Sequence, residues 1–182
     1  MMMGNNAKGR AASVVAWSVL KQGEWELVVG ATEAGLYFVG GNGVSLDDCR
    51  TRNPAAFAGS EWVRDDEPVA PYIREIAEYL EGRRHSFTVR HDLRGTPFQL
   101  AVWGALLAIP FGTSVSYSRI AEAIGKPSAV RAVGAAIGAN PVLITVPCHR
   151  VIGKNGSLTG YRGGLAMKTK LLELEHEAVP AR

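Results

Sequence analysis

Near its start, the chain alternates short apolar runs with polar turns. Residues 13–20 (SVVAWSVL), 25–31 (WELVVGA) and 35–41 (GLYFVGG) are rich in valine, leucine and aromatic side chains. The segments between them, KQGE and TEAG, and the GNG that follows have the polar residues and glycines of tight connections. The pattern predicts three antiparallel strands.

The next periodic segment, residues 67–82, has the spacing of a helix, with Gly82 as a suitable end and strand-like residues 85–93 (HSFTVRHDL) after it. Its apolar positions are Val69, Ile73, Ile76, Ala77 and Leu80. We interpret residues 11–92 as a small α/β subdomain with an antiparallel sheet. No catalytic constellation stands out in it, and we expect Asp47 and Asp48 in a solvated turn rather than at a metal.

The pattern becomes helical in the second half of the chain. A helix is predicted within residues 95–112, ended by Pro110 and Gly112. Its apolar face consists of Phe98, Ala101, Val102, Ala105, Leu106 and Ile109. Residues 116–125 and 126–140 then predict two helices that meet at Gly125, the helix-turn-helix arrangement of many DNA-binding domains.

The second of these two helices is built largely of alanine and glycine, and Arg131 stands nearly alone on it as a long side chain. Such a thin helix is often explained by tight packing against its neighbours. A thin helix that carries one long cation also suits close approach to a nucleic-acid groove. Both interpretations stay open at this point.

The composition is that of a soluble globular protein, with 47% hydrophobic residues and a mean hydropathy of +0.03 over 182 residues. The start of the chain lacks the apolar region of a signal peptide, and no apolar run approaches the roughly 18 residues of a membrane span. We expect residues 1–10 to be disordered and the protein to be intracellular. Its two cysteines, Cys49 and Cys148, fit free thiols in a reduced compartment.

Charge is distributed unevenly along the chain. Residues 1–92 carry 10 Lys and Arg against 13 Asp and Glu, a net charge of −3, whereas residues 93–182 carry 10 against 4, a net charge of +6. A basic half is consistent with a polyanionic partner such as nucleic acid, although many domains of this charge bind none.

Cys148 lies in the motif VPCHRVIG, residues 146–153. A buried cysteine is often only structural, but a thiol beside cations can react as a thiolate. Adjacent residues on an extended chain point in opposite directions, so we expect a bridging water between Cys148 and His149 rather than a direct contact. A zinc site would need a second spaced pair of ligands, and cysteine proteases take their histidine from a distant part of the chain.

Three segments together carry a resemblance to a known family. Residues 116–140 (SYSRIAEAIGKPSAVRAVGAAIGAN), 140–153 (NPVLITVPCHRVIG) and 156–175 (GSLTGYRGGLAMKTKLLELE) closely resemble the O6-alkylguanine-DNA alkyltransferase family. The resemblance runs from about Thr96 to Glu175 with the spacing of the family. It implies an α+β fold of two subdomains: a ribonuclease-H-like N-terminal one, and a mainly helical, winged-helix-like C-terminal one over residues 93–182 that binds DNA and transfers the alkyl group.

The resemblance implies a suicide repair protein that flips O6-alkylguanine, and also O4-alkylthymine, out of duplex DNA. The alkyl group moves to Cys148, with His149 acting through a water as base, Glu175 orienting the histidine, and Asn140 bracing the turn before the cysteine. Pro141 ends the helix there, because a proline pushes the preceding residue out of the α region. The reaction needs no cofactor, and one molecule repairs one lesion.

The resemblance also assigns residues to the DNA and to the base. Tyr117 would donate to the flipped guanine and crowd a phosphate, and Arg131 would enter the base stack as a finger. The remaining DNA contacts are expected at Ser118, Ala129 and Ala132. The base pocket is expected to be lined by Tyr161, Val151, Pro147 and Thr159.

The chain departs from some relatives that hold zinc in the N-terminal half through two cysteines and two histidines. It has only Cys49 there, with His85 and His91 nearby, so no metal is expected. The expected partner is double-stranded DNA, without a membrane. We expect a monomer that works in the cytoplasm, at the nucleoid or in the nucleus, according to the organism.

Three other functions are compatible with parts of the sequence. An alkyltransferase-like damage sensor would flip the base without reacting, but such proteins replace the cysteine. A helix-turn-helix transcription factor would be expected to carry a regulatory extension. A thiol hydrolase would turn over repeatedly, whereas an alkyl acceptor gains one group and stops.

Overall fold

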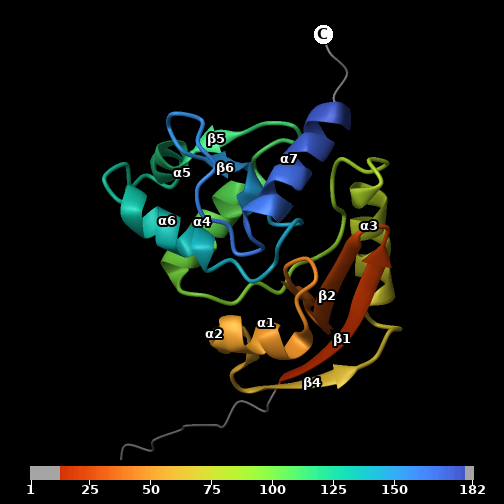
Figure 1. Ribbon diagram of the computed structural model, residues 1–182. Helices are drawn as coiled ribbons and strands as arrows, with labels where there is room; N and C mark the ends of the chain where they lie inside the picture. The colour runs from red at the N-terminus through yellow and green to blue at the C-terminus, as the bar shows by residue number, and fades with distance from the viewer. Residues whose placement is uncertain (1–12, 179–182) are drawn as a thin grey trace, which may run out of the picture.

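The computed structural model describes residues 13–178, so the expectation that residues 1–10 are disordered lies outside the described part of the chain. The N-terminal half of this part contains four strands and three helices (Figure 1). In chain order these are β1 (Ser13–Gln22), β2 (Trp25–Thr32), β3 (Gly35–Val39), α1 (Leu46–Arg52), α2 (Pro54–Phe57), β4 (Ser60–Arg64) and α3 (Ala70–Leu80).

The sheet has the strand order β3-β2-β1-β4. The pairs β1–β2 and β2–β3 are antiparallel, as their short connections require, but β4 pairs with β1 in parallel. The expected antiparallel sheet is therefore mixed. The chain leaves the sheet after β3, passes through α1 and α2, and returns beside β1, which is the crossover that a parallel pair needs. Asp47 and Asp48 are exposed in the first turn of α1, which corrects the expected solvated turn.

The helix within residues 67–82 is confirmed as α3, and Gly82 follows it with a φ of 71°, a conformation that glycine adopts readily. The strand-like residues 85–93 do not form a strand. Only His91 makes an isolated bridge to Leu36, where Leu36 N donates to Arg90 O and Asp92 N donates to Leu36 O. One bridge does not extend into a ladder, so this segment connects the two halves instead.

The C-terminal half is mainly helical. It contains α4 (Pro97–Leu107), β5 (Val115–Ser116), α5 (Tyr117–Ala123), α6 (Val130–Gly138), the short 3₁₀ helix η1 (Cys148–Arg150), β6 (Val151–Ile152) and α7 (Leu165–Ala178). Thr96 and Gln99 form a capping box at the start of α4, with Pro97 in its first turn. Helices α5 and α6 pack on α4 and on each other, and Gly125, with a φ of 70°, makes the turn after α5.

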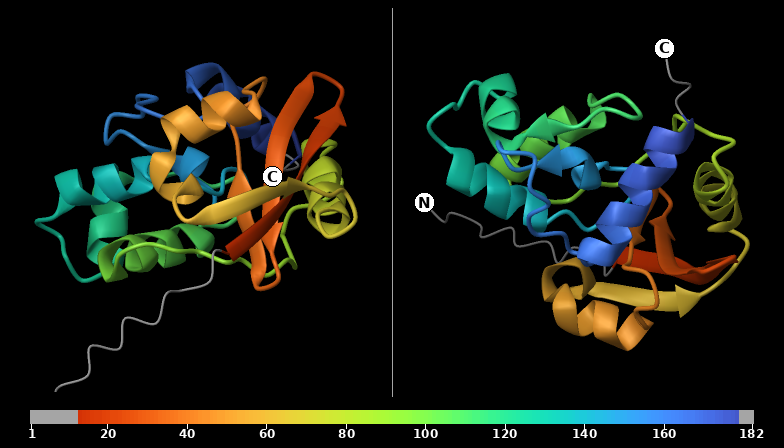
Figure 2. Two further views of the ribbon diagram at one scale, coloured as in Figure 1. Left: turned by 90° about the horizontal axis from the view of Figure 1, so that it is seen from below. Right: turned by 45° about the horizontal axis from the view of Figure 1, so that its top comes forward.

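Two hydrophobic cores lie on opposite faces of the N-terminal sheet (Figure 2). The smaller core lies under α1 and α2 and includes the buried Cys49, while Phe57 stacks on Trp62. The larger core lies under α3 and continues without a break into the C-terminal half. Val29 of β2, Val102 of α4 and Leu171 of α7 all belong to it, so the two predicted subdomains share one core.

The backbone of β3 also reaches the segment that precedes Cys148. Val39 N donates to Pro141 O over 3.1 Å, and Leu143 N donates to Val39 O over 3.3 Å. These two bonds place Val142 beside Val39 in a parallel bridge. The reactive segment is therefore attached to the N-terminal sheet by main-chain hydrogen bonds.

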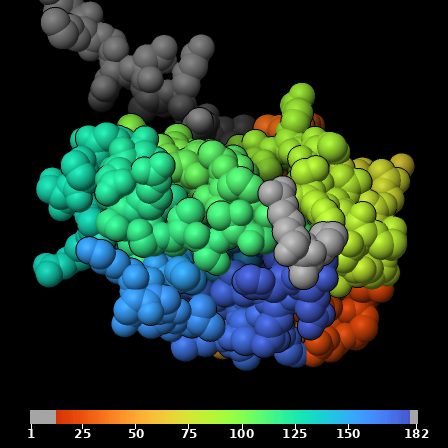
Figure 3. Space-filling model, turned by 90° about the horizontal axis from the view of Figure 1, so that it is seen from above, coloured from red at the N-terminus to blue at the C-terminus, as the bar shows by residue number. Residues whose placement is uncertain are grey.

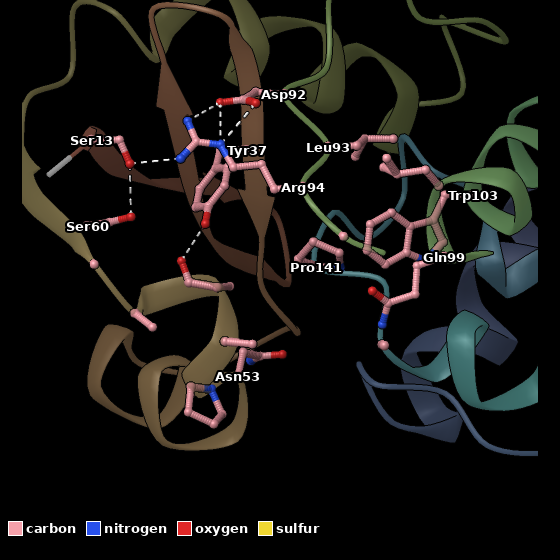
Figure 4. Close-up of a pocket in the computed structure, with 18 of the residues that line it drawn as sticks. Ser13, Tyr37, Asn53, Ser60, Asp92, Leu93, Arg94, Gln99, Trp103 and Pro141 are labelled. Atoms are coloured by element: carbon pink, nitrogen blue, oxygen red, sulfur yellow. Dashed lines mark hydrogen bonds and ion pairs between the residues drawn. The ribbon is translucent and has the colours of Figure 1, made fainter. Parts of the chain in front are cut away.

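A cavity of about 940 Å³ opens between the two halves (Figure 4). On one side, Arg94 lies over the ring of Tyr37 and is held by Asp92 and Ser13; on the other side lie Trp103, Gln99 and Pro141. None of the site residues expected from the sequence lines this cavity. Within residues 13–178, no helix is long and apolar enough to cross a membrane.

Candidate active site

Cys148 begins the short helix η1 in a segment that is buried throughout, residues 140–150. Its side chain is 3% exposed, and burial raises the pKa of the thiol to about 11, although the hydrogen bond from Asn140 and the charge of Lys168 act in the opposite direction. Ile144, four residues earlier, has a φ of 68°. A β-branched residue adopts that conformation only where its surroundings enforce it, so the turn that leads to the thiol is strained.

Asn140 holds this turn together. Its side chain is fully buried, and Nδ2 donates to Val142 O and Val146 O, both over 3.1 Å, and to Cys148 Sγ over 3.2 Å. Its Oδ1 accepts from Val142 N over 3.0 Å. The amide therefore connects the end of α6 to both sides of the turn and to the sulfur.

His149 follows Cys148 but faces the opposite way. Its Nε2 lies 2.8 Å from Glu175 Oε1 of α7, whereas its Nδ1 is buried with no hydrogen-bond partner among the described residues. Burial lowers the pKa of His149, partly offset by the hydrogen bond to Glu175, so the imidazole is neutral. An Nε2–H that donates to Glu175 leaves Nδ1 as a free acceptor.

Glu175 is 1% exposed and is the centre of a buried network. Arg150 donates to it through Nε and Nη2, Gly112 N donates to Oε2 over 2.9 Å, and Tyr79 Oη donates to Oε1 over 2.6 Å. Burial alone would raise the pKa of this carboxyl, but the hydrogen bonds from His149, Arg150 and Tyr79 lower it to about 2. Glu175 is therefore an ionised acceptor and not a surface charge of α7.

Two of the residues expected at the base pocket, Val151 and Thr159, are connected by hydrogen bonds from Lys168. Thr159 Oγ1 donates to Tyr117 Oη over 3.1 Å, and the hydroxyl of Tyr161 is buried without a partner among residues 13–178. Lys168 is fully buried, and its Nζ donates to Val151 O over 2.6 Å and to Thr159 O over 3.0 Å. Pro147 is buried directly before the cysteine.

The residues expected at DNA lie on the two packed helices. Tyr117 and Ser118 begin α5, where the Ser118 hydroxyl bonds that of Ser116 over 2.9 Å. Ala129 precedes α6, and Arg131 and Ala132 are exposed in its first turn. Because the inner face of α6, with Val133, packs in the core, tight packing and an exposed Arg131 coexist on different faces of this helix.

Three residues of the site escaped the sequence reasoning. Arg150 could have been suspected, since it lies in the Cys148 motif beside the histidine, whereas Lys168 lies in a segment rich in lysine and gave no local signal. Tyr79 lies on α3, in the N-terminal half, where the sequence showed no group of catalytic residues. No local sequence pattern pointed to it. Of the two N-terminal histidines, His91 Nε2 bonds Thr145 over 2.9 Å, and His85 stacks on Phe111. No group of acidic, cysteine and histidine residues within 13–178 is arranged to hold a metal ion.

The chain is similar in sequence and in fold to known DNA methyltransferases. Residues 97–177 match the family described as 6-O-methylguanine DNA methyltransferase, DNA binding domain. The inducible methylated-DNA–protein-cysteine methyltransferase of Bacillus subtilis is 57% identical over 162 residues, which cover 89% of this chain and 90% of that protein. The corresponding protein of Mycobacterium bovis is 50% identical over 122 residues, covering 67% of this chain and 74% of its own length.

A solved structure described as Mycobacterium tuberculosis OGT in complex with DNA has a TM-score of 0.78 and 39% sequence identity, covering 92% of this chain and 96% of its own. The fold and the sequence are thus similar to those of cysteine-dependent DNA methyltransferases. The chain belongs to the methylated-DNA–protein-cysteine methyltransferase family, whose members repair DNA by transferring an alkyl group to one of their own cysteines.

Proposed function

We propose that Cys148 accepts the alkyl group from O6-alkylguanine, and also from O4-alkylthymine, in duplex DNA. The observation that carries this assignment is the arrangement around the sulfur. Asn140 Nδ2 donates to Sγ over 3.2 Å, and the next residue, His149, is bonded to the buried Glu175, whereas the other cysteine, Cys49, is buried in the separate core under α1.

The displacement forms a bond between sulfur and the alkyl carbon and breaks the bond between that carbon and the guanine oxygen. The thiol proton passes through a water to His149 Nδ1, and the electron pair of the broken bond goes to guanine. Donors quench the charge that develops on the leaving base, a role open to the Tyr117 hydroxyl and to backbone N–H groups. The guanine anion then takes up a proton from water, and His149 returns its own proton to water. The products are a thioether and an unmodified guanine, so each molecule reacts once.

The proposed proton path depends on the histidine keeping one tautomer. Glu175 accepts from Nε2, and its low pKa keeps it ionised, so Nδ1 stays an acceptor. With a thiol pKa of about 11, only about one thiol in ten thousand is ionised at pH 7 without help. Proton removal by the histidine is therefore the step that the site has to supply.

Docking on DNA is assigned to the helices α5 and α6. The exposed Arg131 on the small-residue surface of α6 would replace the extruded base in the stack, and Tyr117 would crowd the adjoining phosphate. We assign residues 93–182 to DNA binding and alkyl transfer and residues 11–92 to their support. The work takes place in the compartment that holds the DNA, which is the cytoplasm in a cell without a nucleus.

The test is the intact mass of the protein after incubation with a duplex that contains O6-methylguanine. The wild type should gain one methyl group per molecule and stop, and peptide mapping should place it on Cys148. Cys148→Ala should gain none, while Cys49→Ala, the matched control, should react like the wild type. Continued turnover would indicate a hydrolase, and methyl on the Cys148→Ala protein would refute the assignment.

A further inference from the structure

Tyr79 connects the N-terminal half to the network around Glu175. It lies in the last turn of α3, is fully buried, and its Oη lies 2.6 Å from Glu175 Oε1, 96 residues away in sequence. The same hydroxyl lies 3.3 Å from His149 Nε2. Figure 1 and the right view of Figure 2 show α3 next to α7, and Figure 3 shows both on the face seen from above.

The charges in this cluster determine which groups carry a proton and which only accept a hydrogen bond. Burial and the neighbouring Glu175 raise the pKa of Tyr79 well above its usual value, so the hydroxyl keeps its proton. Glu175 is ionised and can only accept. Tyr79 therefore donates to Oε1, which also receives Nε2–H of His149. The lone pairs of the Tyr79 oxygen are left facing that same N–H, as a second and longer acceptor for it.

The ring of Tyr79 is held independently of its hydroxyl. It packs against Phe87 at a centroid distance of 5.3 Å and meets Phe111 edge-on at 5.9 Å. Phe111 is in turn covered by the guanidinium of Arg150 and stacked on His85. Removing the hydroxyl alone should therefore leave the packing of the ring in place.

We infer that Tyr79 is a positioning residue for alkyl transfer: its hydroxyl fixes the Glu175 carboxylate and the Nε2–H tautomer of His149, so that the N-terminal half contributes directly to thiol activation. This inference rests on the proton path proposed above. Without the hydroxyl, Oε1 would lose one of its donors and Nε2–H its second acceptor. The carboxylate could then turn toward Arg150, and the imidazole would be held less firmly.

The charged and titratable groups that face the cluster are few. Glu175 and Lys168 come from α7, Tyr161 comes from the segment before it, His149 and Arg150 come from η1, and His85 approaches only through Phe111. A change in the pH profile of a Tyr79 variant would therefore report on the His149–Glu175 pair and on the thiol that it serves.

The experiment compares Tyr79→Phe with Tyr72→Phe in the full chain. Tyr72 lies on the same helix, is half-buried against the same core, and makes no hydrogen bond through its hydroxyl within residues 13–178. The single-turnover rate of methyl transfer is measured from pH 6 to 11. Since general-base catalysis is worth about 10²–10⁴ in rate, weakening it in Tyr79→Phe should slow transfer by about tenfold at pH 7. The deficit should shrink as the thiol ionises unaided above pH 10.

Two further measurements separate positioning from packing. In a His149→Ala background, adding Tyr79→Phe should change the rate less than twofold, because the group that it positions is gone. The ¹⁵N shifts of the His149 ring should show Nε2–H alone in the wild type and in Tyr72→Phe, with a share of the other tautomer in Tyr79→Phe. The tautomer is read without turnover and does not depend on DNA binding.

The outcomes are distinct. A Tyr79→Phe rate equal to that of the wild type overturns the inference, and so does an equal slowing at every pH that persists without His149. If His149→Ala itself reacts like the wild type, the proposed proton path is wrong, and the role of Tyr79 falls with it. If His149→Ala is slow and Tyr79→Phe is not, the proton path stands and only Tyr79 is excluded.

Discussion

The side-chain nitrogen of Asn140 lies 3.2 Å from the sulfur of Cys148, and the same nitrogen donates to two carbonyls of the turn between them. One amide thus closes the turn and contacts the reactive atom. Position of the thiol and stability of the turn are therefore coupled through a single side chain.

Asn140→Ala should damage both properties. It leaves Val142 N buried without a partner and removes one of the two donors of the Val146 carbonyl, which keeps only Cys148 N, at a cost of about 2–4 kcal/mol in the free energy of unfolding. Chemical denaturation measures the loss, and methyl transfer should slow in the fraction that stays folded. Asn155→Ala, at an exposed loop position, loses only the solvent-accessible hydrogen bond from Ser157 N and should cost less, about 1 kcal/mol at most. Equal stability of the two variants would contradict this account of the turn.

His149→Ala and Glu175→Gln should slow methyl transfer near pH 7, the first by about 10²–10⁴-fold and the second less. Both deficits should shrink as the pH rises toward the thiol pKa of about 11, because ionised sulfur needs no base. Single-turnover rates from pH 6 to 11 test this, with DNA affinity as the control for folding. A Glu175→Gln protein as fast as the wild type throughout would remove Glu175 from the proton path.

Arg131→Ala should slow repair in duplex DNA by about 10- to 1000-fold, because the finger offsets a few kcal/mol of unstacking. Reaction with free O6-benzylguanine should be nearly unchanged, since the free base needs no flipping. Arg74→Ala, an exposed arginine on α3, should leave both rates as they are. If both substrates slowed equally with Arg131→Ala, the arginine would be acting on the pocket rather than on the stack.

Acid should destabilise the protein through Glu175. Its pKa is about 2 in the folded chain and about 4.3 when unfolded, so its stabilisation is complete above about pH 5 and is lost as the pH falls toward 2. The loss is on the order of 3 kcal/mol, from about 1.4 kcal/mol per pKa unit. Glu175→Gln should be less stable than the wild type at pH 6, and the gap should narrow between pH 5 and pH 2. Parallel unfolding curves of the two proteins over that range would show that Glu175 does not titrate as described.

Local patterns in the sequence were sufficient for much of the fold. The first three strands follow from short apolar runs between turn residues, and α3, α4 and the pair α5 and α6 follow from the helical spacing of their apolar residues. β4 was missed because its five residues, with Trp62 as the only large side chain packed against the core, show no repeating pattern of apolar positions. Its parallel pairing with β1 depends on a crossover connection that no local sequence signal encodes.

The candidate site was likewise only partly predictable from the sequence. The residues around Cys148 are close in sequence and could be named from their motif. The partners of Glu175 come from three separate segments and meet only after folding: Tyr79 from α3, Gly112 from the loop after α4, and His149 and Arg150 from η1. A tyrosine 96 residues upstream, surrounded by apolar positions of its own helix, looks like an ordinary core residue.

The bridge between Val39 and Val142 has a consequence for the motions of the reactive segment. The amides of the reactive segment are not those of a surface loop, since Leu143 is buried and its N–H is bonded to β3, the edge strand of the four-stranded sheet. Opening that bond requires β3 to separate from the segment, which disturbs the core shared by both halves. The Leu143 amide should therefore exchange its hydrogen for deuterium about as slowly as those of the central strands, by global rather than local opening. The thiol would then lie in one of the segments of the chain that open least often.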